Sequence, residues 1–151
     1  MFGLVKTICK NAMKLDSDKI LKKVFSDSEL KTFVLDLNRI DQLYDKGVTA
    51  DDKYLGNYSA VTIEGTKNFK GKEEKGQRYD HITLKDTGDF YDSFRLKTES
   101  SDFIITADTE KPDVDLMTYG KILGLDNESK TKLIEHIKIP VREMVLSQIA
   151  K

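Results

Sequence analysis

The sequence predicts an α+β fold in which helices come first, a small sheet follows and helices return. Along residues 2–46 apolar residues recur at steps of three and four, which is the spacing of one helix face. Short runs rich in β-branched and aromatic residues then extend to residue 108, and the helical spacing returns after Pro112. A chain of 151 residues, 38% of them hydrophobic, is long enough for one core but not for two ordinary ones. We therefore expect a single domain, 1–151.

The first third of the chain predicts three helices. Two short ones form an N-terminal helical arm at 1–25, whose folding can depend on assembly, and the third opens an α+β core at 26–151. Ser17 is the expected cap of the second helix. The third helix opens at Ser26, in capping-box spacing with a glutamate, and ends at Gly47. The apolar face of the first helix consists of Leu4, Val5, Ile8, Cys9, Ala12 and Met13, and that of the third of Leu30, Phe33, Val34, Leu37, Ile40, Leu43 and Tyr44.

Four strands follow, and we expect them to form one small, mainly antiparallel four-stranded sheet. Their ranges are 58–63, 79–84, 93–99 and 102–108. Only two serines join the last two strands, which predicts a hairpin.

Helices return near the C-terminus. Residues 113–123 predict a short helix and residues 126–151 a long one, in which Pro140 predicts a kink. The apolar face of the long helix consists of Leu133, Ile134, Ile137, Val141, Val145 and Ile149.

The charges nearly cancel, but their distribution along the chain is uneven. With 25 Lys and Arg against 26 Asp and Glu, the chain lacks the overall positive charge that drives sequence-independent binding to nucleic acids or membranes. Residues 1–24 carry six lysines and two aspartates, whereas residues 89–115 carry eight acidic and three basic residues. Such opposite poles are usually a solvated surface, but in a ring or stack they favour head-to-tail contacts between copies.

The single cysteine and the short apolar runs limit the cellular setting. Cys9 cannot form an internal disulfide, and no apolar run approaches the roughly 20 residues that cross a bilayer. We therefore expect a protein made in a reducing cytoplasm, with no membrane partner.

No group of residues predicts catalysis, a metal site or a cofactor. The two histidines and the cysteine lack the clustered spacing of a zinc site. Asp86, Asp89 and Asp92 step by three, whereas a calcium loop requires D-x-D-x-D-G and a later glutamate. We therefore expect a protein without enzyme activity.

The stretch 65–78 predicts a basic connection that can contact DNA non-specifically or serve only as a solvated loop. Five residues rather than four separate Gly65 from Gly71, and Glu73 stands where a phosphate-binding loop needs Ser or Thr. A metal-dependent nuclease would want an E-x-K motif, but the lysine after Glu64 lies one residue too far along. The cations of the loop are Lys67, Lys70, Lys72, Lys75 and Arg78.

The segment "LKDTGDFYDSFRL", residues 84–96, predicts a structural corner between a strand and the hairpin. The strand ends at its leucine, the threonine can cap one helical turn, and the glycine permits a sharp change of direction. Phe90 and Phe94, four apart, fall on the same face of that turn and reach the core. The corner residues are Leu84, Thr87, Gly88, Phe90 and Ser93.

This corner and the hairpin "RLKTESSDFIITAD" after it resemble the L-x-x-T/S-G-x-L-x-x-S element of neck and tail-completion proteins of tailed bacteriophages. The segments 37–59 and 119–145 are similar to virion proteins of phages and prophages of Bacteroides-type hosts, including the crAss-like group. The resemblance covers roughly residues 30–150, and the five corner residues take the family's corner positions. After the hairpin, "KPDVDLMTYGKILGL" replaces a small-residue, Glu-Gly segment of many members, which leaves subunit contacts and ring size open.

The resemblance implies a structural virion protein without turnover that forms a ring between portal or connector and tail and helps to enclose the DNA channel. It implies a homo-oligomer of about six or twelve copies. Its other partners would be neighbouring portal, connector or tail proteins and, by non-specific contact, channel DNA. The protein would be made in the host bacterial cytoplasm and end in the neck or tail of the virion. Two other classes stay open: a nucleic-acid-binding protein or metal-dependent nuclease, and a small regulatory interaction domain.

Overall fold

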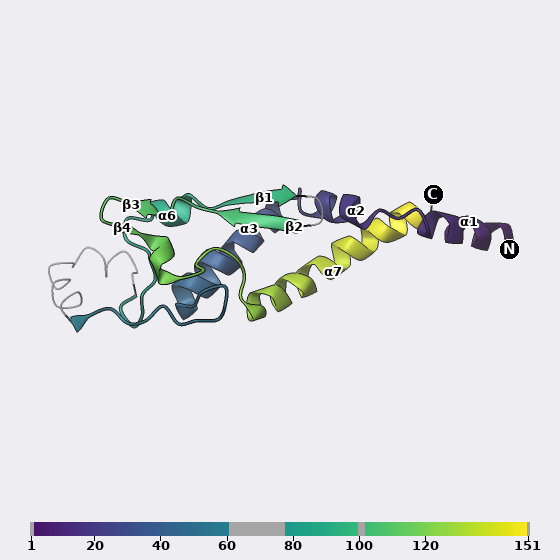
Figure 1. The fold of residues 1–151 in the computed structure, drawn as a ribbon. Coiled ribbons are helices and arrows are strands. Elements are labelled where there is room, and N and C mark those ends of the chain that lie inside the picture. Colours follow the sequence, from purple (N-terminus) through teal and green to yellow (C-terminus); the bar gives the residue numbers. More distant parts are fainter. Residues whose placement is uncertain (1, 61–77, 100–101, 151) are drawn as a thin grey trace.

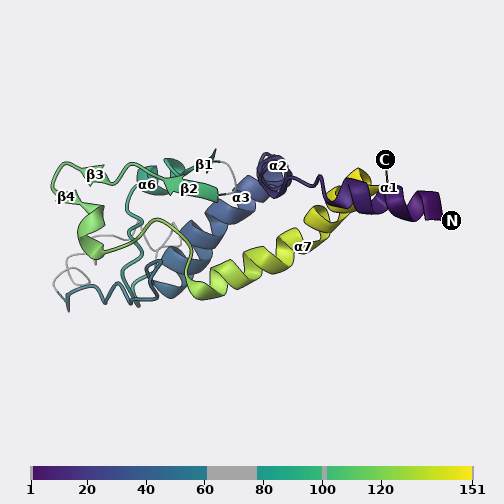
Figure 2. The ribbon, with the colours of Figure 1, turned by 45° about the vertical axis from the view of Figure 1, so that its right-hand side comes forward.

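The computed structural model describes residues 2–60, 78–99 and 102–150. The molecule is elongated, with helix α1 at one end and the short strands β3 and β4 near the other (Figure 1). A view turned by 45° shows the same separation (Figure 2). In chain order the elements are α1 (Phe2–Ala12), α2 (Ser17–Val24), α3 (Ser28–Asp36), η1 (Leu37–Lys46), α6 (Asp89–Asp92), β1 (Arg95–Glu99), β2 (Asp102–Thr106), β3 (Glu110–Lys111), β4 (Val114–Asp115), η3 (Leu116–Tyr119) and α7 (Asn127–Ile149).

The three N-terminal helices form as predicted, but aspartates rather than serines cap two of them. Asp16, not Ser17, caps α2 and accepts hydrogen bonds from two backbone N–H groups of its first turn. Asp27 caps α3 and accepts from the N–H of Leu30 at 2.8 Å. The predicted capping box at Ser26 is wrong, because that hydroxyl donates to a carbonyl of the preceding turn. A carboxylate at this position satisfies the free N–H groups and also interacts favourably with the helix dipole.

Helix α3 continues into η1, a stretch of wider π-helical turns, and the combined helix ends at Gly47 as predicted. Gly47 has a φ of 63°, a left-handed conformation that glycine adopts without the steric cost of a Cβ. Long runs of π-helical turns are rare and usually have a structural or functional reason. Here the turns carry Asn38 and Gln42, two amide side chains that are 0% exposed on an otherwise apolar face.

The predicted single four-stranded sheet is wrong, because the described residues form two separate two-stranded antiparallel sheets. The predicted hairpin is confirmed as β1–β2, with Arg95 opposite Thr106 and Glu99 opposite Asp102. The second sheet, β3–β4, was not predicted from the sequence. It is a hairpin of two residues in each strand, with Glu110 opposite Asp115.

Residues 79–84 form no strand, for two local reasons. Leu84 has a φ of 58°, outside the extended region, and the backbone of Thr83 bonds to tyrosine side chains instead of a neighbouring strand. Of the predicted strand 58–63, residues 58–60 are described and do not pair as a strand, whereas 61–63 lie outside the described residues.

The long C-terminal helix is confirmed as α7, which continues from Asn127 to Ile149 with Pro140 inside it. The kink at this proline stays a prediction. The short helix predicted at 113–123 is reduced to the single 3-10 turn η3, because the residues before it pair in β4.

The core lies where α2, α3, η1, α6, the β1–β2 hairpin and α7 meet. Phe25 after α2 packs on Phe103 of β2, with ring centroids 5.1 Å apart. Helix α2 therefore belongs to the core, while every described apolar side chain of α1 is exposed. The buried hydrophobic residues are Ile20, Val24, Phe25, Leu30, Val34, Leu37, Leu43, Leu55, Phe90, Tyr91, Phe94, Ile105, Leu116, Ile122, Leu125 and Leu133.

Candidate interaction surfaces

Four of the five predicted corner residues lie in or directly beside the single turn α6, and the fifth, Leu84, packs against the core before it. Gly88, with a φ of 101°, occupies the N-cap position of α6, so Thr87 is one residue too early to be the cap predicted for it. Thr87 instead donates its hydroxyl to the Asp89 carboxylate at 2.6 Å and accepts from the Asp89 N–H at 3.4 Å. The threonine therefore stabilises the turn through its two hydrogen bonds to Asp89, from a position before the helix.

Ser93 connects the corner to a residue that follows the β1–β2 hairpin. Its hydroxyl donates to the carbonyl of Phe90 at 2.6 Å and accepts from the N–H of Asp108 at 2.8 Å. Because Asp108 follows β2, one side chain fixes both the end of α6 and the exit from the sheet. The small serine predicted at this point therefore has a bonding role as well as a spatial one.

Tyr91 is a corner residue that the sequence pattern did not single out. It is buried between Phe90 and Phe94, with centroid distances of 5.7 Å and 6.1 Å. Its hydroxyl donates to the carbonyl of Thr83 at 2.5 Å, and burial raises the pKa of this phenol far above its usual value, so it stays a donor. The sequence did contain a signal for this role, because a tyrosine placed between two core phenylalanines is itself buried and needs a hydrogen-bond partner for its hydroxyl.

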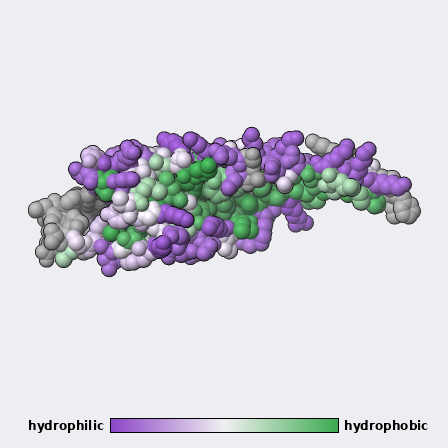
Figure 3. All heavy atoms as spheres, viewed as in Figure 1, coloured by the Kyte–Doolittle hydropathy of each residue, from purple (hydrophilic) through white to green (hydrophobic). Residues whose placement is uncertain are grey.

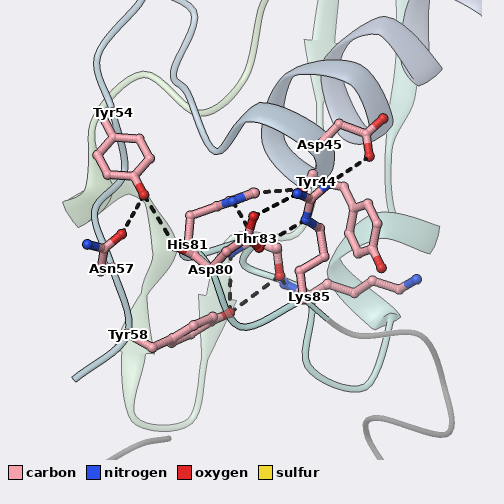
Figure 4. A network of polar contacts seen from close by, with 10 residues as sticks. Tyr44, Asp45, Tyr54, Asn57, Tyr58, Asp80, His81, Thr83 and Lys85 are labelled. Carbon is pink, nitrogen blue, oxygen red and sulfur yellow. Dashed lines mark hydrogen bonds and ion pairs between the residues drawn. The ribbon is translucent and has the colours of Figure 1, made fainter. Parts of the chain in front are cut away.

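A polar network replaces the predicted strand 79–84 (Figure 4). The hydroxyl of Tyr58 accepts from the N–H of Thr83 at 3.2 Å, and Tyr91 bonds to the carbonyl of the same residue. His81 is buried, and its Nε2 donates to the carbonyl of Tyr44 at 2.8 Å near the end of η1. A Cβ built on Gly47 would lie 2.3 Å from the His81 ring, so only glycine fits there. Hydrogen bonds to side chains therefore fix the segment 79–84, and its role here is structural.

Arg78 is the one predicted DNA-contact residue that the structure describes. Its guanidinium donates to both carboxylate oxygens of Asp80, at 3.0 Å and 2.7 Å, and lies 3.6 Å from the Asp45 carboxylate. The arginine holds the pKa of the Asp80 carboxyl well below its usual range. The remaining residues predicted for the DNA contact, Lys67, Lys70, Lys72 and Lys75, lie outside the described residues.

Two buried amides fix the segment that leads into α7. Asn38 donates to the carbonyl of Ile122 at 3.0 Å and accepts from the N–H of Gly124 at 3.0 Å. Gln42 continues the pattern, donating to the carbonyl of Gly124 at 3.1 Å and accepting from the N–H of Asp126 at 2.8 Å. Side chains four apart on a helix are spaced to meet backbone groups two residues apart on an extended segment.

Asp126 and a group of ion pairs then fix the start of α7. The carboxylate of Asp126 is buried and caps the helix through the N–H of Ser129 at 2.7 Å. Lys132 lies 2.9 Å from Asp41 and 3.1 Å from Glu128, and these carboxylates raise the pKa of the lysine. We call the pair Asn38 and Gln42 the amide ladder. The sequence analysis did not predict it, although two polar residues four apart within an apolar helix face were a signal for it.

Helix α1 presents a hydrophobic face that the rest of the described chain does not cover. Leu4 is 67% exposed and Met13 is 87% exposed. The contact to the body that the structure does show is at the far end of the helix, where Asn11 donates to the carbonyl of Ile149 at 3.3 Å. Figure 3 shows a hydrophobic band along α1 with hydrophilic atoms beside it. We define the α1 surface as Leu4, Val5, Ile8, Cys9 and Met13 with the flanking lysines Lys6, Lys10 and Lys14.

The opposite end of the molecule carries exposed apolar residues among carboxylates. Met117 in η3 is 43% exposed, and Val114 and Tyr119 beside it are exposed as well. Asp115 caps η3 by accepting from the N–H of Met117 at 2.9 Å. We define the acidic hairpin surface as Val114, Met117 and Tyr119 with Asp108, Glu110, Asp113 and Asp115.

Two further features, a metal site and a membrane-spanning helix, are absent from the part of the chain that the structure describes. There, no three His, Cys, Asp or Glu residues are grouped so that they could hold a metal ion. No helix in the described ranges is long and apolar enough to cross a membrane.

Comparison of the chain with family models, with curated proteins and with solved structures found no match in any of the three. The function is therefore inferred from the surfaces described above and from the resemblance of the corner segment.

Proposed function

We propose that this chain is a structural virion protein of a tailed phage, an adaptor of the neck or tail that assembles into a ring around the DNA channel. The resemblance of the corner and hairpin supplies the class of protein. The observation that carries the proposal is the uncovered α1 surface, because a helix with its apolar face in water gains stability from a partner.

The fold of the body fits this role. Hydrogen bonds of the amide ladder join η1 to a segment more than 80 residues away, and Ser93 of the corner is bonded to the N–H of Asp108 after the hairpin. Such fixed connections suit a subunit whose surfaces must keep their relative positions in an assembly. The α1 surface and the acidic hairpin surface lie towards the two ends of this body (Figures 1 and 2).

The first experiment measures the mass of the native particle. Purified protein is analysed by light scattering and electron microscopy, and virions from the culture that carries the gene are searched for the chain by mass spectrometry. We expect a closed ring of about six or twelve copies and presence of the chain in virions. A protein that stays monomeric at high concentration and is missing from virions would refute the proposal.

A pair of matched variants tests the role of α1. Leu4→Asp with Val5→Asp places charges on the α1 surface, whereas Ile134→Asp with Ile139→Asp does so at exposed apolar positions of α7. We expect the first variant to fall to monomers and the second to keep the ring. The same samples separate the alternatives, because a nuclease cleaves DNA with Mg²⁺ or Mn²⁺ as a monomer, and a regulatory domain assembles only with a different protein.

A further inference from the structure

We propose that the α1 surface of one copy docks on the acidic hairpin surface of a second copy, so that successive chains join head to tail. The inference rests on the ring proposed above and names the two surfaces that would close it.

The segments that carry the two surfaces have net charges of opposite sign and equal size. Residues 2–15 contain three lysines and no acidic residue, a net charge of +3. Residues 108–116 contain four acidic residues and one lysine, a net charge of −3. Within the described ranges, no ion pair involves any of the three α1 lysines or the four hairpin carboxylates. Complementary charges of this kind steer association and fix its register.

The acidic hairpin also contains a local conflict that a cationic partner would relieve. Glu110 lies directly opposite Asp115 in the β3–β4 pair, and like charges in that position destabilise a hairpin. No residue of the described chain offers either carboxylate an ion pair. Lysines from α1 of another copy would turn this repulsion into attraction.

Both surfaces combine an apolar centre with a charged edge, which is the usual anatomy of a protein interface. On α1 the lysines recur every four residues beside an open apolar hollow lined by Val5, Cys9 and Met13. At the hairpin, Val114 and Met117 are exposed apolar residues, and the carboxylates of residues 108–115 are exposed as well. Lysine can lay its aliphatic stem on apolar surface while its ammonium group reaches a carboxylate.

The positions of the two surfaces decide the kind of assembly. Because α1 and the β3–β4 hairpin lie at opposite ends of an elongated chain, one copy cannot join its own two surfaces (Figures 1 and 2). A contact between different patches is heterologous, so its repetition leads to a ring where the rotation closes and to a filament where it does not. Closure of a ring would add stability, because each copy is then held by two contacts.

A cross-linking experiment tests the contact directly, because Cys9 on the α1 surface is the single cysteine of the chain. The Met117→Cys variant adds a second thiol, on the acidic hairpin surface, and a short bis-maleimide joins thiols that lie close together. We expect a ladder of covalent oligomers that extends to the ring, whereas the natural chain stays monomeric on a denaturing gel. Ile134→Cys, at an exposed position on α7, is the matched control and should give no ladder.

Charge reversal tests the complementarity. The α1 variant changes Lys6, Lys10 and Lys14 to Glu, and the hairpin variant changes Glu110, Asp113 and Asp115 to Lys. We expect each variant alone to weaken assembly by roughly tenfold or more, and an equimolar mixture of the two to assemble through its matched pairs. Changing Lys22, Lys97 and Lys130 to Glu alters net charge equally at other exposed positions and should leave assembly within about twofold.

The outcomes separate this contact from the wider proposal. A ring that forms in both charge-reversal variants, without a cross-linked ladder in the Met117→Cys variant, overturns the head-to-tail contact but keeps the ring. Cross-linking of the Met117→Cys variant that stops at the dimer overturns it in favour of a reciprocal pair.

Efficient dimers of the natural chain joined through Cys9 of each copy overturn the head-to-tail contact in favour of packing between α1 helices. Co-sedimentation of the natural chain with anionic phospholipid vesicles, without a ladder, assigns α1 to a lipid surface instead. Absence of assembly in every chain would overturn the ring itself.

Discussion

Helix α1 and the combined helix α3–η1 have the same apolar spacing in sequence but opposite surroundings in the fold. Most of the face of α3–η1 is covered by the chain itself: Val34 and Leu43 are completely buried, and Ile40 is 38% exposed. The face of α1 is exposed over its whole described length. Amphipathic spacing therefore predicts a helix but does not say whether its own chain or another molecule covers it.

The difference also separates two kinds of stability. Segments near α3–η1 are fixed by buried hydrogen bonds and packed aromatic rings, so they open only with most of the domain. Helix α1 has few buried contacts, and it should exchange its amide hydrogens much faster than α3 in a monomeric sample. Assembly would therefore change α1 far more than the body.

The largest expected effect comes from the same substitution made in the two helices. Leu43→Ala should lower the free energy of unfolding by about 3–5 kcal/mol, because it leaves a cavity in a packed core. Leu4→Ala should change the stability of the monomer by less than about 0.5 kcal/mol yet reduce the ring fraction. Urea denaturation of dilute protein measures the first quantity and particle mass the second. Equal losses of stability in both variants would contradict the comparison.

The amide ladder should give the next largest effect. Asn38→Leu keeps the size of the side chain but leaves the Ile122 carbonyl and the Gly124 N–H buried without their partner. We expect a loss of about 2–4 kcal/mol in urea denaturation, since each buried unpaired group costs about 1–3 kcal/mol. Gln148→Leu, at an exposed position of α7, is the control and should be nearly neutral. A neutral Asn38→Leu would show that segment 122–126 does not need the ladder.

Gly47→Ala should cost about 2 kcal/mol or more, because it combines a left-handed φ with a Cβ that overlaps the His81 ring. Thermal unfolding of Gly47→Ala, His81→Ala and the double variant separates the two causes. We expect the double variant to lose less stability than the sum of the single ones, since removal of the ring relieves the overlap. Strict additivity would mean that the backbone conformation alone requires glycine.

The smallest effect should be the contribution of Asp51 to stability at acidic pH. Hydrogen bonds from Lys53 and Thr49 lower the pKa of this carboxyl from 3.8 to about 2. A carboxyl with a lowered pKa in the folded state stabilises the protein above its ordinary pKa and loses that contribution as the pH falls from about 3.8 to about 2. Thermal midpoints of the natural chain and Asp51→Asn should therefore differ slightly at pH 7 and converge near about pH 2. Thermal midpoints that differ by the same amount at both pH values would contradict this assignment.

Much of the local structure could be predicted from the sequence because local rules govern it. The spacing of apolar residues located α1, α2, α3 and α7, and Gly47 marked the end of the combined helix. The corner was found from Gly88 and its flanking aromatic residues, and the β1–β2 hairpin from two short strand patterns joined by serines. Even here the capping residue was misplaced at α2 and α3, since serine and aspartate compete for the same role.

The strand predicted at 79–84 shows why other parts could not be found. Its composition is that of a strand, but the N–H of Thr83 donates to the hydroxyl of Tyr58 and the carbonyl of Thr83 accepts from that of Tyr91. Strand propensity reflects packing on a sheet surface, so it cannot tell a sheet from a segment held by side chains. The amide ladder was invisible for the same reason, because its partners are more than 80 residues apart.

The sequence by itself determined the helices, the hairpin, the corner and the uneven charge of the chain, since each depends on neighbours a few residues away. Only the tertiary structure decided that Asn38 and Gln42 hold the start of α7, that two hairpins replace one sheet, and that α1 stays uncovered. The physical reason is that burial and hydrogen-bond partners are set by which distant segments meet. The tertiary structure also places the basic helix α1 and the acidic β3–β4 hairpin towards opposite ends of one elongated molecule.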